Sequence, residues 1–262
     1  VDGSGVLHDP NGLDRDELLR LAKARVMISN YDVAKLSSDG YRVLVDDKNL
    51  TLPDGEVVQN GTSFRNLYHL RSKGVQVFVP CGGRPEAIDI SNVSKFIDAN
   101  GNTLIPYIVE GANLFITQNA KLRLEKAGAI VFKDASSSLE VLASLAFDDS
   151  GFFKNMCIDE DGNVPQFYKD YVKEVQAIIQ NNARLEFEAI SRENEKTGNP
   201  RSVLSDELSN AINDLTEELS ASTLWDDVAF RNSILSEALP HQLQSAIGLD
   251  LILDRVPTNY LR

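Results

Sequence analysis

Residue types that build covalent or metal sites are scarce in this sequence. Its 262 residues include only two cysteines, Cys81 and Cys157, and three histidines. So few cysteines argue against a disulfide framework and favour a reducing compartment, the cytoplasm or alternatively the mitochondrial matrix. The histidines, His8, His69 and His241, lie far apart in the sequence and belong to no HExxH motif or His/Cys pair. We therefore expect no metal site.

The sequence also contains few basic residues and no long apolar run. Lys and Arg number 26 against 39 Asp and Glu, which gives a formal net charge of −13. Because a polyanion binds to a basic face, this balance argues against nucleic acid as a partner. No apolar run approaches the length of a transmembrane helix, so we expect no membrane partner either.

Two signature motifs are missing. Without a G-x-S-x-G elbow, a Ser-His-Asp hydrolase has no support. The missing G-x-G-x-x-G fingerprint counts against a complete dinucleotide-binding domain. The chain opens at Val1 without Met, in what reads as a strand and turn. We interpret it as an internal piece, since the fingerprint lies about 20 residues before the acid that binds the ribose.

Short apolar runs dominate the middle of the chain. Three of them, Val75–Val79, Ile105–Val109 and Ala129–Phe132, are bounded by loop residues, as parallel strands buried on both faces would be. A helix over 117–126, closed by Gly128, would join the last two as a βαβ unit. This pattern predicts an α/β fold: a partial Rossmann-like dinucleotide-binding domain, whose parallel sheet lacks the first strand and the glycine-rich turn, followed by an α-helical region.

The first 60 residues carry weaker signals. A turn over 3–5 and a loop through Gly12 precede a helix that the capping box of Asp14 and Glu17 begins. Alternating runs separated by turn residues then predict a small β insertion around 41–58.

The charge balance changes near residue 147. Residues 1–147 hold 18 acidic and 16 basic side chains, whereas residues 148–262 hold 21 and 10. Such a shift is typical of a domain boundary. We predict that 1–147 is the C-terminal part of the dinucleotide-binding domain and that 148–262 is a helical C-terminal region.

Apolar stripes mark the helices of the second half. A long helix is expected from Pro165, and another carries the stripe Leu204, Leu208, Ile212, Leu215 and Leu219. Stripes of this kind also occur on partner-binding helices. Their usual meaning is core packing, here against the preceding domain, and we prefer that interpretation.

Three features follow the ends of predicted strands, where α/β enzymes bind ligands. The first is Asp2, which ends an apparent strand. In a dinucleotide fold such an acid accepts hydrogen bonds from the ribose hydroxyls and repels a 2′-phosphate. The alternative is an aspartate that only stabilises a turn, and the local sequence alone favours that alternative.

The other two features are rich in small residues. The run P-C-G-G-R-P over 80–85 has paired glycines, which let backbone approach a ligand but also serve plain tight turns. Its cysteine is more often a small packed residue than a nucleophile. The run E-G-A-N over 110–113 leaves room for a flat ring, and Asn113 offers both a donor and an acceptor. The serine run over 136–138 would by itself indicate only a helix N-cap.

Five segments carry a family resemblance. They read V-D-G-S-G-V-L-H-D-P-N-G-L-D-R-D-E (1–17), F-V-P-C-G-G-R-P (78–85), Y-I-V-E-G-A-N-L-F-I-T-Q (107–118), L-E-K-A-G-A-I-V-F-K-D-A (124–135) and S-S-S-L-E-V-L-A-S-L-A (136–146). In content, order and spacing they resemble the large NAD-specific glutamate dehydrogenases of the fungal type. The resemblance covers most of the chain and weakens in the β insertion and toward the C-terminus.

The resemblance implies oxidative deamination of L-glutamate to 2-oxoglutarate and ammonium by a homo-oligomeric enzyme, with NAD as the hydride acceptor. The residues that it assigns are Asp2 for the adenosine ribose; Cys81, Gly82 and Gly83 beside the nicotinamide ribose; Gly111, Ala112 and Asn113 around the nicotinamide; and Ser137 for the substrate carboxylate. The lysine and acid that move protons belong to the family's substrate domain. We therefore assign no catalytic residue to this chain.

The sequence departs from the family at one junction. The family usually runs D-A-S-A-N-K-G-G-V-T-S-S-S-L-E, whereas here Asp134-Ala135 leads straight into Ser136. Either the chain lacks this glycine loop, or the loop is mobile and missing from the sequence as it is known. We favour the second explanation, because a strand end and a helix start are normally joined by several residues.

Two other functions stay open. A nucleotide-binding or scaffold module without catalysis would fit the missing glycine loop. A dehydrogenase of another amino acid is the second, since the pocket that selects the substrate would lie mostly outside this chain. An upstream reading frame with a glycine-rich fingerprint and a lysine-bearing substrate domain would favour an enzyme.

Overall fold

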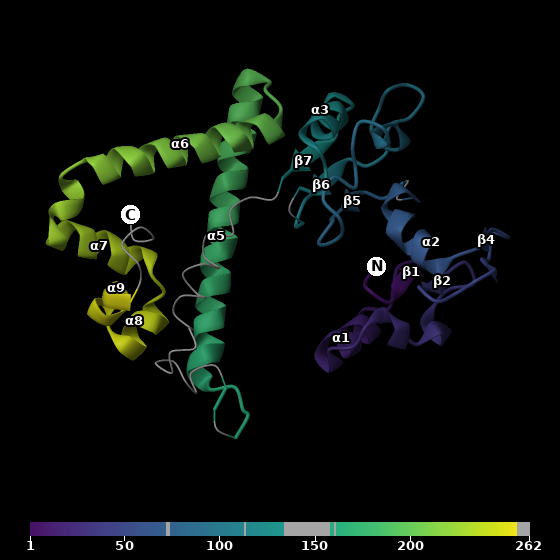
Figure 1. Cartoon of the computed structure of the whole chain (residues 1–262), viewed down its shortest axis with the longest axis horizontal. Coiled ribbons are helices and arrows are strands. Elements are labelled where there is room, and N and C mark those ends of the chain that lie inside the picture. The colour runs from purple at the N-terminus through teal and green to yellow at the C-terminus, as the bar shows by residue number, and fades with distance from the viewer. Residues whose placement is uncertain (72–73, 113, 134–157, 160, 256–262) are drawn as a thin grey trace. The chain divides into compact units, whose positions relative to one another are not determined.

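The computed structural model describes residues 1–71, 74–112, 114–133, 158–159 and 161–255, and Figure 1 labels their helices and strands. Two compact units make up the chain: unit 1 is Val1–Phe78 with Ser91–Pro106, and unit 2 is Val79–Ile90 with Tyr107–Arg262. The predicted boundary at 147/148 lies outside the described residues and stays a prediction. Within the described ranges, no helix is both long and apolar enough to cross a membrane.

Unit 1 is built from short elements. They are β1 (Gly5–His8), α1 (Arg15–Ala24), η1 (Ile28–Asn30), η2 (Val33–Lys35), β2 (Tyr41–Leu44), β3 (Leu50–Thr51), β4 (Val57–Val58), α2 (Gly61–Leu67), η3 (Tyr68–Arg71), β5 (Val77–Phe78) and η4 (Val93–Phe96). Strand β1 pairs antiparallel with β2, from Gly5 opposite Leu44 to His8 opposite Tyr41, and β3 pairs antiparallel with β4.

Strand β1 corrects the sequence-based expectation of a loop between the turn and Gly12. Its four residues are too few for a clear alternation, and its partner β2 lies more than 30 positions away. The strands predicted around 41–58 are confirmed. Strand β2 completes a ladder that β1 begins, and the description of 41–58 as an insertion stays a prediction.

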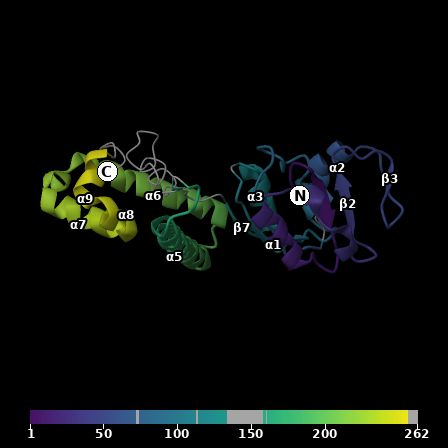
Figure 2. The ribbon, with the colours of Figure 1, turned by 90° about the horizontal axis from the view of Figure 1, so that it is seen from below.

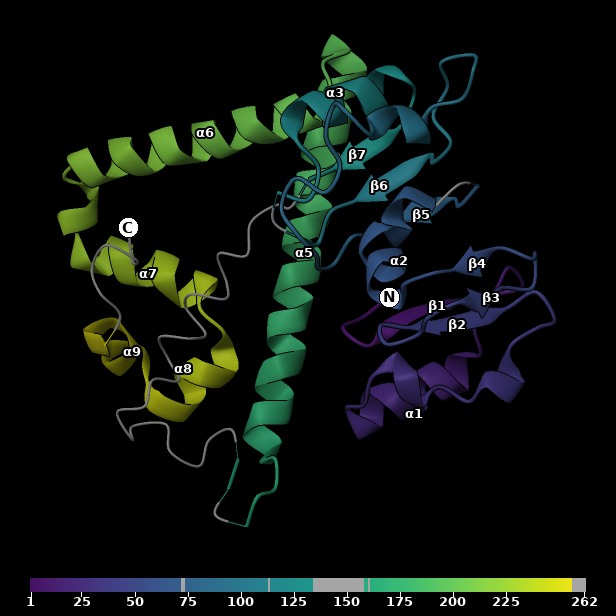
Figure 3. The same ribbon diagram turned by 45° about the vertical axis from the view of Figure 1, so that its right-hand side comes forward.

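Both faces of the β1–β2 pair are covered by helices. Figure 3 shows α1 and α2 on opposite sides of it. Leu7 packs with Leu21 of α1 on one face, while Val6 and Val43 pack with Phe64 of α2 on the other. Alternation along β1 therefore serves two small cores, as the period of a strand requires.

The predicted capping box at α1 is confirmed at its N-cap, because the Asp14 side chain accepts a hydrogen bond from Glu17 N. Glu17 itself is buried and ties α1 to the following segment. Its carboxylate accepts two hydrogen bonds from Arg20, at 2.8 and 2.6 Å, and one from Asp32 N at 2.9 Å. These bonds, the Arg20 bonds foremost, lower the pKa of Glu17 from its ordinary value of 4.5 to about 2.

This shift predicts a loss of stability in acid. Above pH 4.5 Glu17 is ionised in both states, and as the pH falls toward about 2 the unfolded chain takes up the proton first. We expect the melting temperature to drop across that window and Glu17→Gln to make the drop shallower, measured by circular dichroism against pH. The control is Asp16→Asn, at an exposed position of the same helix. An equal flattening in both variants would contradict the role given to Glu17.

Unit 2 starts with a parallel strand pair and continues in helices. Its elements are β6 (Tyr107–Val109), α3 (Gln118–Lys126), β7 (Ile130–Phe132), α5 (Gln166–Thr197), α6 (Arg201–Ala221), η5 (Leu224–Asp226), α7 (Val228–Ala238), α8 (His241–Ile247) and α9 (Leu249–Arg255). Strands β6 and β7 pair in parallel, from Tyr107 opposite Ile130 to Val109 opposite Phe132. With α3 between them they form the predicted βαβ unit, and the partial Rossmann-like α/β class is confirmed.

The predicted burial of these strands on both faces is wrong in part. Ile108 and Val131 are fully buried, but Tyr107 and Val109 are 49% and 42% exposed. Because neighbouring side chains of a strand point to opposite faces, one face of β6 is left uncovered by the described residues.

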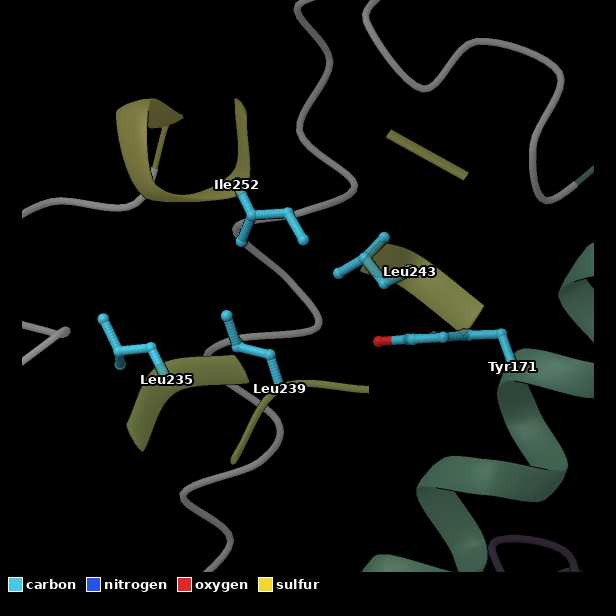
Figure 4. Close-up of a cluster of buried hydrophobic side chains, with 5 residues drawn as sticks. All are labelled: Tyr171, Leu235, Leu239, Leu243 and Ile252. Carbon is cyan, nitrogen blue, oxygen red and sulfur yellow. The ribbon is translucent and has the colours of Figure 1, made fainter. Parts of the chain in front are cut away.

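The helices of unit 2 form their own core. Figure 2 shows α7, α8 and α9 gathered at one end of α6. In Figure 4, Tyr171 extends from α5 toward Leu239, which directly follows α7, and Leu243 of α8, with Leu235 and Ile252 completing the buried cluster. The stripe predicted on α6 packs at its two ends, and its last residue, Leu219, lies against this cluster, but its middle is exposed. Leu204 is buried, whereas Ile212 and Leu215 are 57% and 66% exposed, so the expectation of continuous core packing is wrong there.

Polar contacts dock the start of α6 onto the βαβ unit. The fully buried Ser202 donates to the Glu125 carboxylate of α3 through its backbone N at 3.0 Å and its Oγ at 2.6 Å. Lys133, just after β7, forms an ion pair with Asp206 of α6. The carboxylate of Glu125 thus caps the helix N-terminus, where a negative charge is favoured.

Candidate functional site

Two loops that are distant in sequence lie side by side in unit 2. One spans 80–88 and the other, which follows β6, spans 110–116. Three backbone hydrogen bonds join them: Gly111 N to Pro80 O at 2.9 Å, Glu86 N to Leu114 O at 2.7 Å and Ile88 N to Phe115 O at 3.1 Å. The structure therefore brings together the two glycine-containing runs that the sequence singled out.

The glycines of these loops are constrained in different ways. A Cβ on Gly111 would lie 3.1 Å from Cys81 Sγ, and one on Gly83, whose φ is +123°, would lie 2.9 Å from the Phe115 ring. Gly82 has open space around it and an ordinary φ. Gly83 is thus required by its φ and by the Phe115 ring, a side chain on Gly111 would have to displace Cys81 Sγ, and nothing in the described fold requires a glycine at 82.

Positions 81–83 and 111–112 of the paired loops carry only small side chains. Cys81, Gly82, Gly83 and Gly111 are exposed, and Ala112 is half-buried. The Cys81 thiol is free. Small residues beyond a strand end let a flat ring lie close to the backbone, as a nicotinamide would need, so the residues present fit this part of NAD. Asn113 and Ser137, predicted to contact the cofactor and the substrate, lie outside the described residues.

A buried charge pair lies beneath loop 110–116. Glu110 Oε1 accepts a hydrogen bond from Ile116 N at 2.8 Å, and Oε2 lies 2.7 Å from Nζ of Lys121 in α3. Neither residue was given a role from the sequence. The signal was present, because Glu110 directly follows a strand and Lys121 lies between Ala120 and Leu124 on the buried face of α3.

Asp2, the predicted ribose ligand, belongs to unit 1 and uses its carboxylate within that unit. Oδ1 accepts from Ser4 N at 2.8 Å and Ser4 Oγ at 2.7 Å, and Oδ2 accepts from Ile28 N at 2.8 Å. Burial raises the pKa of Asp2, but these hydrogen bonds outweigh it and hold the pKa below its ordinary value. The turn-stabilising role is thus real. Oδ2 accepts only one hydrogen bond and keeps a lone pair, so the ribose role stays a prediction.

No metal site is found in the part of the chain that the structure describes. Among the residues that the structure describes, no group of three or more His, Cys, Asp or Glu side chains could hold a metal ion.

Comparison with known proteins identifies long relatives. Over its full length the chain is 67% identical to an NAD-specific glutamate dehydrogenase of Neurospora crassa, 56% to a probable NAD-specific glutamate dehydrogenase of Schizosaccharomyces pombe and 47% to an NAD-specific glutamate dehydrogenase of Saccharomyces cerevisiae. It covers 26%, 24% and 26% of their lengths. The chain therefore spans about a quarter of the curated relatives that it matches. No solved structure matches it.

The same alignments bear on the missing glycine loop. The 262-residue sequence is continuous from Asp134 to Ser136, so the expectation of a loop missing from the known sequence is wrong. The alignment with the Neurospora relative runs over 271 residues, nine more than this chain has. The chain is thus shorter than its relatives within the matched region.

A family model covers most of the chain as well. The model described as Glutamate/Leucine/Phenylalanine/Valine dehydrogenase matches residues 1–198, which include both glycine loops, the βαβ unit and α5. This match and the identities of 47% or more over the whole chain agree on one protein family. The chain belongs to the Glutamate/Leucine/Phenylalanine/Valine dehydrogenase family.

Proposed function

We propose that this chain is the cofactor-binding part of a longer NAD-dependent glutamate dehydrogenase. The reaction is the oxidation of L-glutamate by NAD⁺ with water, giving 2-oxoglutarate, ammonium, NADH and a proton. The observation that carries the proposal is the pair of exposed, nearly side-chain-free loops at 81–83 and 111–112, in a family whose members here are named as NAD-specific. The parent enzyme is proposed to be homo-oligomeric and cytoplasmic, with the mitochondrial matrix as the alternative.

The chain's share of the chemistry is orientation. NAD, when bound, supplies the hydride acceptor. Gly82, Gly83, Gly111 and Ala112 let the ring approach the backbone, and Asp2 accepts hydrogen bonds from the adenosine ribose hydroxyls. Proton transfer is left to groups outside this chain, because the lysine and acid that move protons belong to the substrate domain that the family resemblance implies.

Gly82→Val in the full-length protein tests this proposal. Because Gly82 has open space around it and no unusual φ, valine disturbs no described contact. If that space receives the cofactor, we expect the dissociation constant for NAD to rise by about tenfold or more, since extra methyl groups would overfill it. The measurement is calorimetric titration with NAD, with Ala99→Val in an exposed turn of unit 1 as the control.

Together with an assay for NADH, the same experiment distinguishes the proposed enzyme from the rival function. A silent nucleotide-binding module, which the shortened junction near Ala135 favours, would respond to Gly82→Val in the same way but would produce no NADH from glutamate. Unchanged NAD affinity in Gly82→Val, beside a wild-type protein that binds NAD, would contradict the placement of the cofactor.

A further inference from the structure

The charge pair beneath loop 110–116 is sealed from water. The side chains of Glu110 and Lys121 are 0% and 4% exposed, and their charged atoms lie 2.7 Å apart. The contact is an ion pair between Glu110 Oε2 and Lys121 Nζ. Buried charges persist only when they are paired, so the two groups depend on one another.

Glu110 closes the loop that it begins. Its backbone N donates to Phe132 O at 2.9 Å, which continues the ladder between β6 and β7. Its carboxylate then reaches across to accept from Ile116 N at 2.8 Å. Both ends of the loop are therefore fixed by one residue, and Gly111 and Ala112 follow it directly in the sequence.

Lys121 keeps that carboxylate in place. Its neighbours on the buried face of α3 are Ala120 and Leu124, both fully buried and apolar. Without the ammonium group the Glu110 carboxylate would lose the cation that lies 2.7 Å from it, which favours uptake of a proton or rotation toward water. Turning outward would break its bond to Ile116 N and release the loop.

We propose that Lys121 is a positioning residue for the cofactor: its charge holds Glu110 beneath loop 110–116 and thereby sets Gly111 and Ala112 at the height where the nicotinamide ring rests. The inference builds on the proposed function. Lys121 is buried under the loop and acts only through Glu110, so it is not a catalytic residue.

The test compares Lys121→Met with Glu110→Gln/Lys121→Met in the full-length protein. The single variant removes the ammonium group that pairs with the Glu110 carboxylate, whereas the double variant removes both charges and keeps a side-chain oxygen for Ile116 N. Hydrogen–deuterium exchange without cofactor should be faster in the peptide spanning 110–117 of the single variant and close to wild type in the double variant. Lys126→Met, at an exposed position of the same helix, is the control and should leave exchange unchanged.

Cofactor binding provides the second readout. We expect KM and the dissociation constant for NAD to rise by about tenfold or more in Lys121→Met, because a small misplacement of binding groups weakens binding strongly. KM for glutamate should change much less, and the double variant should recover most of the NAD affinity. A purely structural role would lower the melting temperature of Lys121→Met without this selective effect on NAD.

The outcomes separate the two proposals. Unchanged exchange at 110–117 together with wild-type NAD affinity in Lys121→Met would overturn the role of Lys121. If Lys121→Met does not fold, the double variant decides: recovered folding with near-wild-type NAD affinity supports the proposal, and folding without NAD affinity overturns it. If the wild-type protein does not bind NAD, that result would instead contradict the proposed function, whatever the hydrogen–deuterium exchange data show.

Discussion

Residues 1–262 on their own are expected to produce no NADH from L-glutamate, whereas the full-length protein should do so under the same conditions. The sequence contains no glycine-rich fingerprint, so the turn that holds a pyrophosphate at a helix N-terminus is missing from it. Neither loop of the candidate site presents a lysine or an acid placed to move a proton at the substrate. Removing general acid–base catalysis alone costs about 10²–10⁴-fold, and losing the phosphate site adds to that.

The measurement is absorbance of NADH during incubation of each purified protein with glutamate and NAD. Circular dichroism on the 262-residue chain is the control, since it separates an inactive folded chain from an unfolded one. Steady NADH production by that chain would show that its own residues supply the missing acid–base groups, and the assignment of no catalytic residue would be wrong.

Asp2→Ser in the full-length protein is expected to lower the preference for NAD over NADP by about tenfold or more, equivalent to about 1.4 kcal/mol or more of differential binding. A carboxylate beside the ribose 2′ position repels the additional phosphate of NADP. The low pKa of Asp2 keeps that charge present at neutral pH. The quantity to compare is the ratio of kcat/KM for the two cofactors.

The structural role of Asp2 calls for a matched control, because the same substitution also removes its bonds to Ser4 and Ile28. Asp9→Ser provides one. Asp9 likewise accepts hydrogen bonds from Ser37 N, Ser37 Oγ and Asn11 N, and it has no predicted cofactor role. We expect Asp9→Ser to lower stability without changing the ratio. A similar loss for NAD and NADP in Asp2→Ser would leave Asp2 as a turn residue only.

Local signals allowed part of the fold to be predicted. The βαβ unit was visible because each strand is a compact apolar run and because Gly128, at φ +94°, marks the end of its helix. Strand β1 was not visible, since its identity depends on a partner in β2. The stripe on α6 has the same spacing along its length, yet its middle, at Ile212 and Leu215, is left exposed by the described residues. Periodicity shows which face is apolar and not whether a neighbour reaches it.

The candidate site was predicted on a similar basis. The paired glycines at 82–83 and the run at 110–113 were chosen for their place after strands, and the structure joins them through backbone hydrogen bonds that no sequence pattern encodes. The dependence of Glu110 on Lys121 was missed, because an acid and a lysine eleven positions apart face each other only once the loop and α3 have packed. For Asp2, the sequence could not reveal the bond to Ile28, 26 positions away.

The cap that Glu125 provides for α6 also sets an order of events during synthesis. Ser202 follows Glu125 by 77 residues, which a ribosome adding about 5–20 residues per second needs roughly 4–15 seconds to make. Throughout that delay the finished βαβ unit would leave the exit tunnel without the helices that later cover Phe132 and Lys133. Exposed apolar strands are prone to self-association in that state. We expect the nascent chain to rely on chaperones until α6 arrives.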